Sequence, residues 1–118
     1  MIRILALIPL LAACTPVAPV PDAASATPPA AGTVTYRCDG GKSLSVTYGR
    51  ENGDDIIRID PNGTGTEMLI AFPVERGVQY SWPSDGSHHI WTLDGTGTLS
   101  YRDGVAATTT AVRTNCKA

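Results

Sequence analysis

Apolar and polar side chains alternate along much of the chain after residue 33. In the segment 34–38 every second residue is apolar, and the segment 44–48 repeats this pattern with Leu44, Val46 and Tyr48. A period of two is typical of a strand with one buried face. Further segments of strand-like composition follow at a spacing of roughly ten residues. They are 54–60, 66–72, 77–82, 88–93, 97–102 and 108–116. The pattern predicts an all-β domain.

Turn-forming pairs separate these segments. Asn-Gly or Asp-Gly occurs at 39–40, 52–53, 62–63, 85–86, 94–95 and 103–104. Such pairs suit tight hairpins, and short connections favour antiparallel pairing of consecutive strands. We therefore expect residues 33–118 to form one small domain, an eight-stranded antiparallel barrel, because closure removes exposed strand edges. A two-sheet sandwich is the alternative.

The N-terminal residues follow a different pattern. Arg3 precedes an apolar run at 4–11, and Ala12 and Ala13 lead to Cys14. This is the layout of a secretory signal, and a cysteine at the cleavage point indicates a bacterial lipoprotein. The run is shorter than the about 20 residues of a membrane-spanning helix. An ordinary cleaved signal with an incidental cysteine is the alternative.

We accordingly predict a lipoprotein signal peptide at 1–13 and lipidation of Cys14, with several acyl chains making a stable anchor. Residues 14–32 are rich in proline and alanine and have almost no large apolar side chain. This composition predicts a flexible tether. Thr15, where an aspartate would favour retention, indicates the bacterial outer membrane. The expected location of the domain is the periplasm, with the lipid as its membrane contact.

The chain has three cysteines, Cys14, Cys38 and Cys116. If Cys14 carries lipid, the other two bracket the domain and can pair in an oxidising compartment. A disulfide between Cys38 and Cys116 requires the first and last strands to be neighbours, which favours a barrel. Two buried free thiols are the alternative.

The charge balance argues against nucleic-acid binding. The formal net charge is −2, and loss of Arg3 with the signal makes the mature chain more negative. No basic cluster is present, whereas nucleic-acid binding needs one. The sign favours a cationic partner.

The domain has little catalytic material. No nucleophile, base and orienting group can be assembled, so we predict that it is not an enzyme and has no cofactor. His88 and His89 are adjacent, and adjacent strand residues point to opposite faces, so we predict no metal site. We expect one of these histidines to be partly buried and the other exposed.

The two tryptophans have different surroundings. Trp91 stands in an apolar segment and is expected in the core, whereas Trp82 precedes Pro83 near a turn and is expected at the surface. An exposed aromatic side chain is often a binding anchor, although single exposed apolar residues are also ordinary.

Several motifs together resemble one protein family. The stretch 36–41 (Tyr-Arg-Cys-Asp-Gly-Gly), the Leu-x-Val-x-Tyr strand at 44–48, Trp91-Thr92 and the terminal Cys116 are similar to the MliC/PliC family. These are membrane-bound or periplasmic inhibitors of C-type lysozyme. The resemblance covers about 34–116 and implies an eight-stranded barrel whose first and last strands are joined by a disulfide. The lipoprotein signal and tether fit the membrane-bound branch.

The resemblance also implies where inhibition takes place, and the chain differs from the family there. The family's Ser-Gly-Ser-Gly-Ala-Arg-Tyr loop corresponds to 74–80, where Gly77 and Tyr80 match and Gln79 replaces the arginine. The family's lysine after Trp-Thr corresponds to Leu93. The candidate residues of the inhibitory loops are Glu75, Arg76, Gly77, Gln79, Tyr80, Leu93 and Asp94.

The resemblance thus implies an inhibitor of C-type lysozyme that inserts loops into the enzyme cleft. Lysozyme cleaves glycans with two carboxyl groups, and Arg76 could pair with them in bidentate geometry. Glu75 and Asp94 would oppose that attraction. The first alternative is a binding module of the same fold with another protein, glycan or small ligand as target. The second is a structural envelope lipoprotein with no discrete ligand.

Overall fold

The structure is a computed structural model that describes residues 28–118. The predicted signal peptide 1–13, the lipidation site Cys14 and most of the tether 14–32 lie outside the described residues. Among the described residues, no helix has the length and apolar character needed to cross a bilayer.

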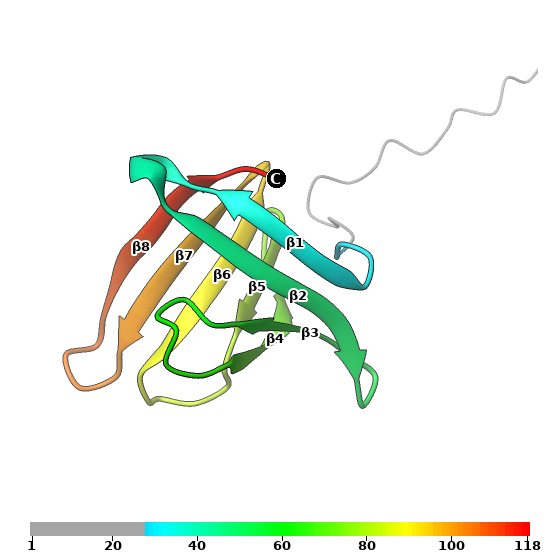
Figure 1. The fold of residues 1–118 in the computed structure, drawn as a ribbon. Coiled ribbons are helices and arrows are strands. Elements are labelled where there is room, and N and C mark those ends of the chain that lie inside the picture. Colours follow the sequence, from blue (N-terminus) through cyan, green and yellow to red (C-terminus); the bar gives the residue numbers. More distant parts are fainter. Residues whose placement is uncertain (1–27) are drawn as a thin grey trace, which may run out of the picture.

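Eight antiparallel strands form one sheet, as predicted (Figure 1). Their bounds are β1 Gly32–Arg37, β2 Ser43–Glu51, β3 Asp54–Ile59, β4 Glu67–Pro73, β5 Val78–Ser81, β6 His88–Asp94, β7 Thr96–Asp103 and β8 Thr108–Cys116. A short 3₁₀ turn, η1 (Asp39–Gly41), joins the first two strands. Each strand pairs with the next in sequence, so the sheet order is β1 to β8. The single sheet excludes the sandwich.

Local sequence explains why these strands form. In β2, Leu44, Val46 and Tyr48 are buried while the residues between them are exposed. The β2–β3 hairpin turns at Asn52 and Gly53, whose φ angles are 53° and 83°. A positive φ at both central residues is the geometry that a tight hairpin requires and that Asn-Gly favours.

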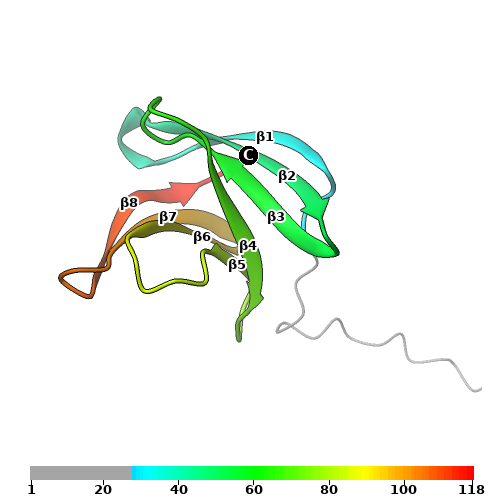
Figure 2. The ribbon, with the colours of Figure 1, turned by 90° about the horizontal axis from the view of Figure 1, so that it is seen from below.

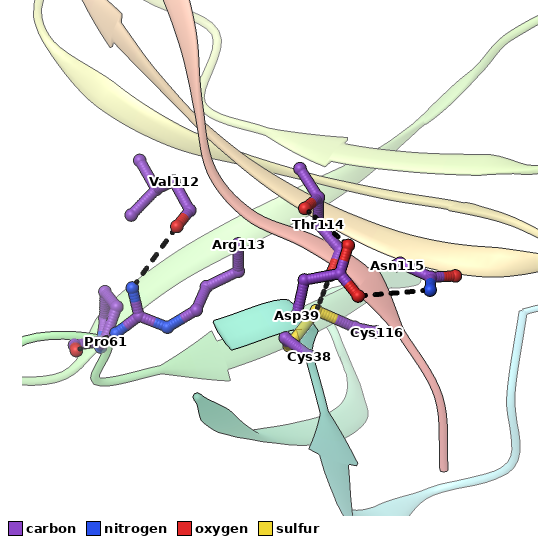
Figure 3. Close-up of a disulfide and its surroundings, with 8 residues drawn as sticks. All are labelled: Cys38, Asp39, Pro61, Val112, Arg113, Thr114, Asn115 and Cys116. Carbon is purple, nitrogen blue, oxygen red and sulfur yellow. Dashed lines mark hydrogen bonds between the residues drawn. A yellow bond between two sulfur atoms is a disulfide. The ribbon is translucent and has the colours of Figure 1, made fainter. Parts of the chain in front are cut away.

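The curled sheet meets itself where β1 and β8 end (Figures 2 and 3). Cys38 and Cys116 form the predicted disulfide. Beside it, the Arg37 amide donates to the Lys117 carbonyl at 2.7 Å, and the Lys117 amide donates to the Arg37 carbonyl at 2.9 Å. Within residues 28–118 this is the one backbone pair that joins the two ends of the sheet. The barrel is therefore closed at one point and open along the rest of that seam.

Asp39 strengthens this point of closure. Its carboxylate accepts hydrogen bonds from the Thr114 hydroxyl at 3.3 Å and from the Asn115 side-chain amide at 3.2 Å (Figure 3). Both donors belong to β8, so η1 and the last strand are held together by side chains as well as by the disulfide.

A group of aromatic side chains fills the centre of the barrel. Trp91 is fully buried, as predicted, and its indole N–H donates to the Tyr48 hydroxyl at 3.0 Å. The Tyr48 and Tyr36 hydroxyls share a hydrogen bond of 2.7 Å. The Tyr36 ring packs edge-to-face on Trp91 at 5.0 Å. Tyr80 is also buried, but its hydroxyl has no hydrogen-bond partner among the described residues.

Burial affects the ionisation of two of these phenols. Desolvation raises the pKa of Tyr48 well above its ordinary value of 10.0, and the hydrogen bond with Tyr36 adds to the increase. Desolvation also raises the pKa of Tyr80, to about 12. Both side chains therefore keep their protons in the folded state at a pH where an unfolded chain has begun to lose them.

The two buried tyrosines differ in hydrogen bonding, which leads to opposite expectations for their phenylalanine variants. Tyr48→Phe should lower the free energy of unfolding by about 1–3 kcal/mol, because it leaves the Trp91 N–H without an acceptor. Tyr80→Phe should leave it unchanged or raise it, because the hydroxyl that is removed has no partner. Denaturant unfolding at neutral pH measures both variants. Equal destabilisation would contradict the assigned hydrogen bonds.

Alkaline pH should destabilise the domain. Above pH 10 the unfolded state releases tyrosine protons that Tyr48 and Tyr80 retain in the folded state, so the free energy of unfolding falls as pH rises. Each of the two groups contributes a slope of up to about 1.4 kcal/mol per pH unit. Denaturant unfolding between pH 8 and 12, in matched buffers, measures the slope. Tyr48→Phe should show a shallower slope than the unsubstituted protein, and an equal slope would contradict this origin.

Candidate functional site

The two segments predicted to form inhibitory loops lie side by side at one end of the barrel. The β4–β5 loop spans 74–77, and the β6–β7 turn is centred on Gly95. Val78 pairs with Pro73 on one side and with Leu93 on the other. Gly97, just after the second turn, pairs with Cys116, so the turn lies next to the C-terminus (Figure 1). We call residues 75–77 and 93–95 the rim.

Gly77 brings the two parts of the rim into contact. Its φ is 70°, in the left-handed region that side chains rarely adopt. A Cβ atom at this position would overlap the Leu93 carbonyl oxygen and would lie 3.1 Å from the Asp94 Cα. A glycine is therefore needed both for the turn and for the close approach of the neighbouring backbone.

The structure places the candidate residues at different depths. Glu75, Arg76 and Asp94 are exposed on the rim. Leu93 is half-buried and packs against the core. Tyr80 is only 1% exposed, so its side chain belongs to the core rather than to the surface of the rim.

Gln79 has a structural contact of its own. It is half-buried in β5, and its side-chain amide donates to the Thr92 hydroxyl of β6 at 3.5 Å. This long hydrogen bond lies between two paired residues of the sheet. Gln79 therefore supports the strands beneath the rim.

The exposed rim is electrostatically mixed. It has the carboxylates of Glu75 and Asp94 and the guanidinium of Arg76, and none of the three forms an ion pair within residues 28–118. Arg76 therefore has five N–H donors to offer to a partner in a fixed fork geometry. The two carboxylates favour positive groups on the same partner.

At the opposite end of the barrel, β5 stops short of its neighbours. Its last pair joins Ile70 to Ser81, so no β5 residue lies between the start of β4 and the start of β6. Glu67 fills that position. Its carboxylate accepts a hydrogen bond from the His89 backbone amide at 3.0 Å and another from His89 Nδ1–H at 2.6 Å. A side chain thus replaces the missing strand as hydrogen-bond partner.

The expectation that one histidine is exposed is wrong, because both are buried. His89 faces inward, where its ring packs edge-to-face against Tyr101 at 5.2 Å. His88 points to the other face of the sheet, and its Nδ1–H donates to the Gly86 carbonyl at 2.9 Å. Both histidines would be exposed on an isolated strand, but here they are covered by the loop after β5 and by the side chain of Glu67. In residues 28–118, no three His, Cys, Asp or Glu side chains are grouped to hold a metal ion.

Sequence reasoning missed a hollow beside this interruption. Its volume is about 310 Å³, and its lining is Glu67, Met68, Trp82, Ser87 and His88. Trp82 is 41% exposed, in agreement with its expected surface position. One signal was visible in the sequence: Glu67 stands two residues before Leu69, on the inward-facing phase of its strand. A charged side chain on the inward-facing side of a strand needs a hydrogen-bonding or oppositely charged partner.

Comparisons of the chain with protein-family models, with curated proteins and with solved structures find no match.

Gly77→Ala should destabilise the domain more than Gly53→Ala. Both positions have positive φ, but a Cβ at Gly53 meets open space whereas one at Gly77 overlaps backbone. The additional loss in the free energy of unfolding should be about 1–3 kcal/mol, the usual cost of overpacking. Denaturant unfolding of the two variants measures the difference. Equal losses would show that the two parts of the rim are not in tight contact.

Proposed function

We propose that this protein is an inhibitor of C-type lysozyme, anchored in the bacterial outer membrane by lipid on Cys14, with its domain in the periplasm. The observation that carries the proposal is the rim, where the β4–β5 loop and the β6–β7 turn meet and leave Arg76 exposed. The eight-stranded antiparallel fold with a disulfide between Cys38 and Cys116 is the scaffold that the MliC/PliC resemblance implies.

Arg76 supplies the chemistry that such a plug needs. The lysozyme cleft contains two carboxyl groups, and a guanidinium can hydrogen-bond a carboxylate through two parallel N–H groups. The serine and lysine of the family are absent, so Arg76 takes over the role of satisfying those carboxylates. Because Glu75 and Asp94 flank it on the rim, they weaken its attraction to the cleft.

The uncharged residues of the rim determine its shape. Leu93 and Gly77 are half-buried, and the tight contact between the two backbones makes the rim a single rigid edge. A preformed edge loses little conformational freedom when it enters a cleft, which favours binding. The tether 14–32 would give the domain reach from the membrane surface.

A binding module of the same fold with a different target is the second candidate. It is favoured by the rim's charges, because two carboxylates outnumber one guanidinium and suit a partner with a basic face. In both proposals the protein acts by binding and has no catalytic residue of its own.

Lysis of bacterial cell walls by a C-type lysozyme should slow as the protein is added. The experiment uses the full mature chain carrying Cys14→Ser, which prevents acylation. We expect inhibition at micromolar protein, and Arg76→Ala should weaken it by about tenfold or more, as for a central charged contact. Arg50→Ala, which removes an exposed guanidinium from β2, is the matched control and should change inhibition by less than about twofold.

The outcomes separate the two candidates. Glu75→Gln should strengthen inhibition, because it removes a charge that opposes Arg76. Equal effects of Arg76→Ala and Arg50→Ala would exclude Arg76 from the inhibitory contact. No loss of lysozyme activity at micromolar protein would reject lysozyme as the target and leave the binding module, whose partner can be sought by affinity capture from periplasmic extracts.

A further inference from the structure

The hollow beside the end of β5 is separate from the rim. The rim lies before Val78, at the start of β5, whereas the hollow lies beyond Ser81, at its end. Met68 and His88 contribute to it from the outer face of the sheet, since their neighbours Leu69 and His89 face inward. Its volume of about 310 Å³ is at the lower end of the roughly 300–1,000 Å³ typical of small-ligand sites.

Trp82 gives this hollow an exposed aromatic wall. The side chain is 41% exposed although it is the largest apolar group of the loop. Its backbone is held by a tight turn in which the Ser84 amide donates to the Trp82 carbonyl at 2.8 Å. The loop is held further by Ser87, whose hydroxyl oxygen accepts from the Gly104 amide at 3.0 Å. The wall therefore belongs to a loop that is fixed at both ends.

The polar groups of the hollow include both acceptors and a donor. Glu67 lines the hollow although it lies on the inward-facing phase of β4, because its side chain occupies the gap beyond the end of β5. Its carboxylate oxygens each accept one hydrogen bond from His89 and keep further lone pairs. His88 uses Nδ1–H to bind the Gly86 carbonyl, so in the neutral ring Nε2 is an acceptor. Ser87 accepts from Gly104 and keeps its hydroxyl hydrogen to donate.

This combination selects the chemical class of ligand. A hydrocarbon would leave the polar groups of the hollow unpaired. Arg102 pairs with His88 in the sheet register, and its positive charge offsets the negative charge of Glu67, so the surroundings of the hollow favour neither an anion nor an organic cation. A neutral sugar ring fits this hollow, because it carries no charge, its apolar face can contact Trp82, and its hydroxyl groups can pair with the polar groups.

We propose that the hollow formed by Trp82, Glu67, Ser87 and His88 is a carbohydrate-binding site. The C–H face of a pyranose ring stacks on the Trp82 indole, and its hydroxyls donate to Glu67 and His88 and accept from Ser87. The site is independent of lysozyme inhibition, because none of its residues lies on the rim.

Backbone amide NMR of the unacylated mature chain tests the site. The probes are the trisaccharides of N-acetylglucosamine and of β-1,4-linked glucose, each titrated to about 20 mM, a range that detects millimolar dissociation constants. We expect at least one probe to give saturable shifts centred on Ser87 and His88. An absence of saturable shifts with both probes would overturn the proposal, as would shifts centred on other residues.

Three variants distinguish stacking from a general effect of exposed aromatic surface. Trp82→Ala should weaken binding by about tenfold or more, and Trp82→Phe should have a smaller effect. Tyr101→Ala is the matched control, because Tyr101 is 39% exposed but does not line this hollow. It should change the affinity by less than about twofold. Equal weakening by Trp82→Ala and Tyr101→Ala would overturn the proposal without affecting the proposal for the rim.

Discussion

The junction between the first and last strands is the constraint on which the rest of the structure depends. The disulfide between Cys38 and Cys116 closes a span of 78 residues. In the chain-entropy treatment a loop of that length contributes up to about 4.5 kcal/mol. Together with two backbone hydrogen bonds and the contacts of Asp39, it holds a single sheet in a curled form. A small domain with a modest core depends strongly on such a link.

The junction is connected to both the core and the rim through one residue. Gly97 pairs with Cys116 on β8 and follows the β6–β7 turn. A Cβ atom at Gly97 would overlap the Trp91 ring, so the core tryptophan packs directly against the start of β7, next to the turn that belongs to the rim. The position of the rim is therefore set by the disulfide on one side and by the buried aromatic group on the other.

Much of the fold could be predicted because its causes are local. The alternation of Leu44, Val46 and Tyr48 determines which face of β2 is buried, and Asn52-Gly53 determines where the hairpin turns. The pairing of Cys38 with Cys116 followed from their positions at the two ends of the domain. The alternation also places Val78 and Tyr80 on the same buried phase, so the burial of Tyr80 was visible in the sequence.

The position of Glu67 in the sequence indicates a need for a partner, but the identity of that partner and the other features at the end of β5 could not be predicted, because they depend on where a strand stops. The burial of both histidines follows from the short β5 and from Glu67, which contacts His89 across 22 positions of sequence. No short-range pattern encodes such a contact. The hollow beside Trp82 arises from the same interruption. The contact of Gly77 with Leu93 likewise becomes evident only when the two hairpins are seen side by side.

The tight approach at Gly77 has an evolutionary consequence. Because the two hairpins touch through their main chains, insertions or bulkier residues at that point would disturb both, and the lengths of the loops are coupled. Glu75, Arg76 and Asp94 are free of this restriction, since their side chains face solvent. The charges on the rim can therefore change by exchange of three surface groups while the scaffold that presents them stays the same.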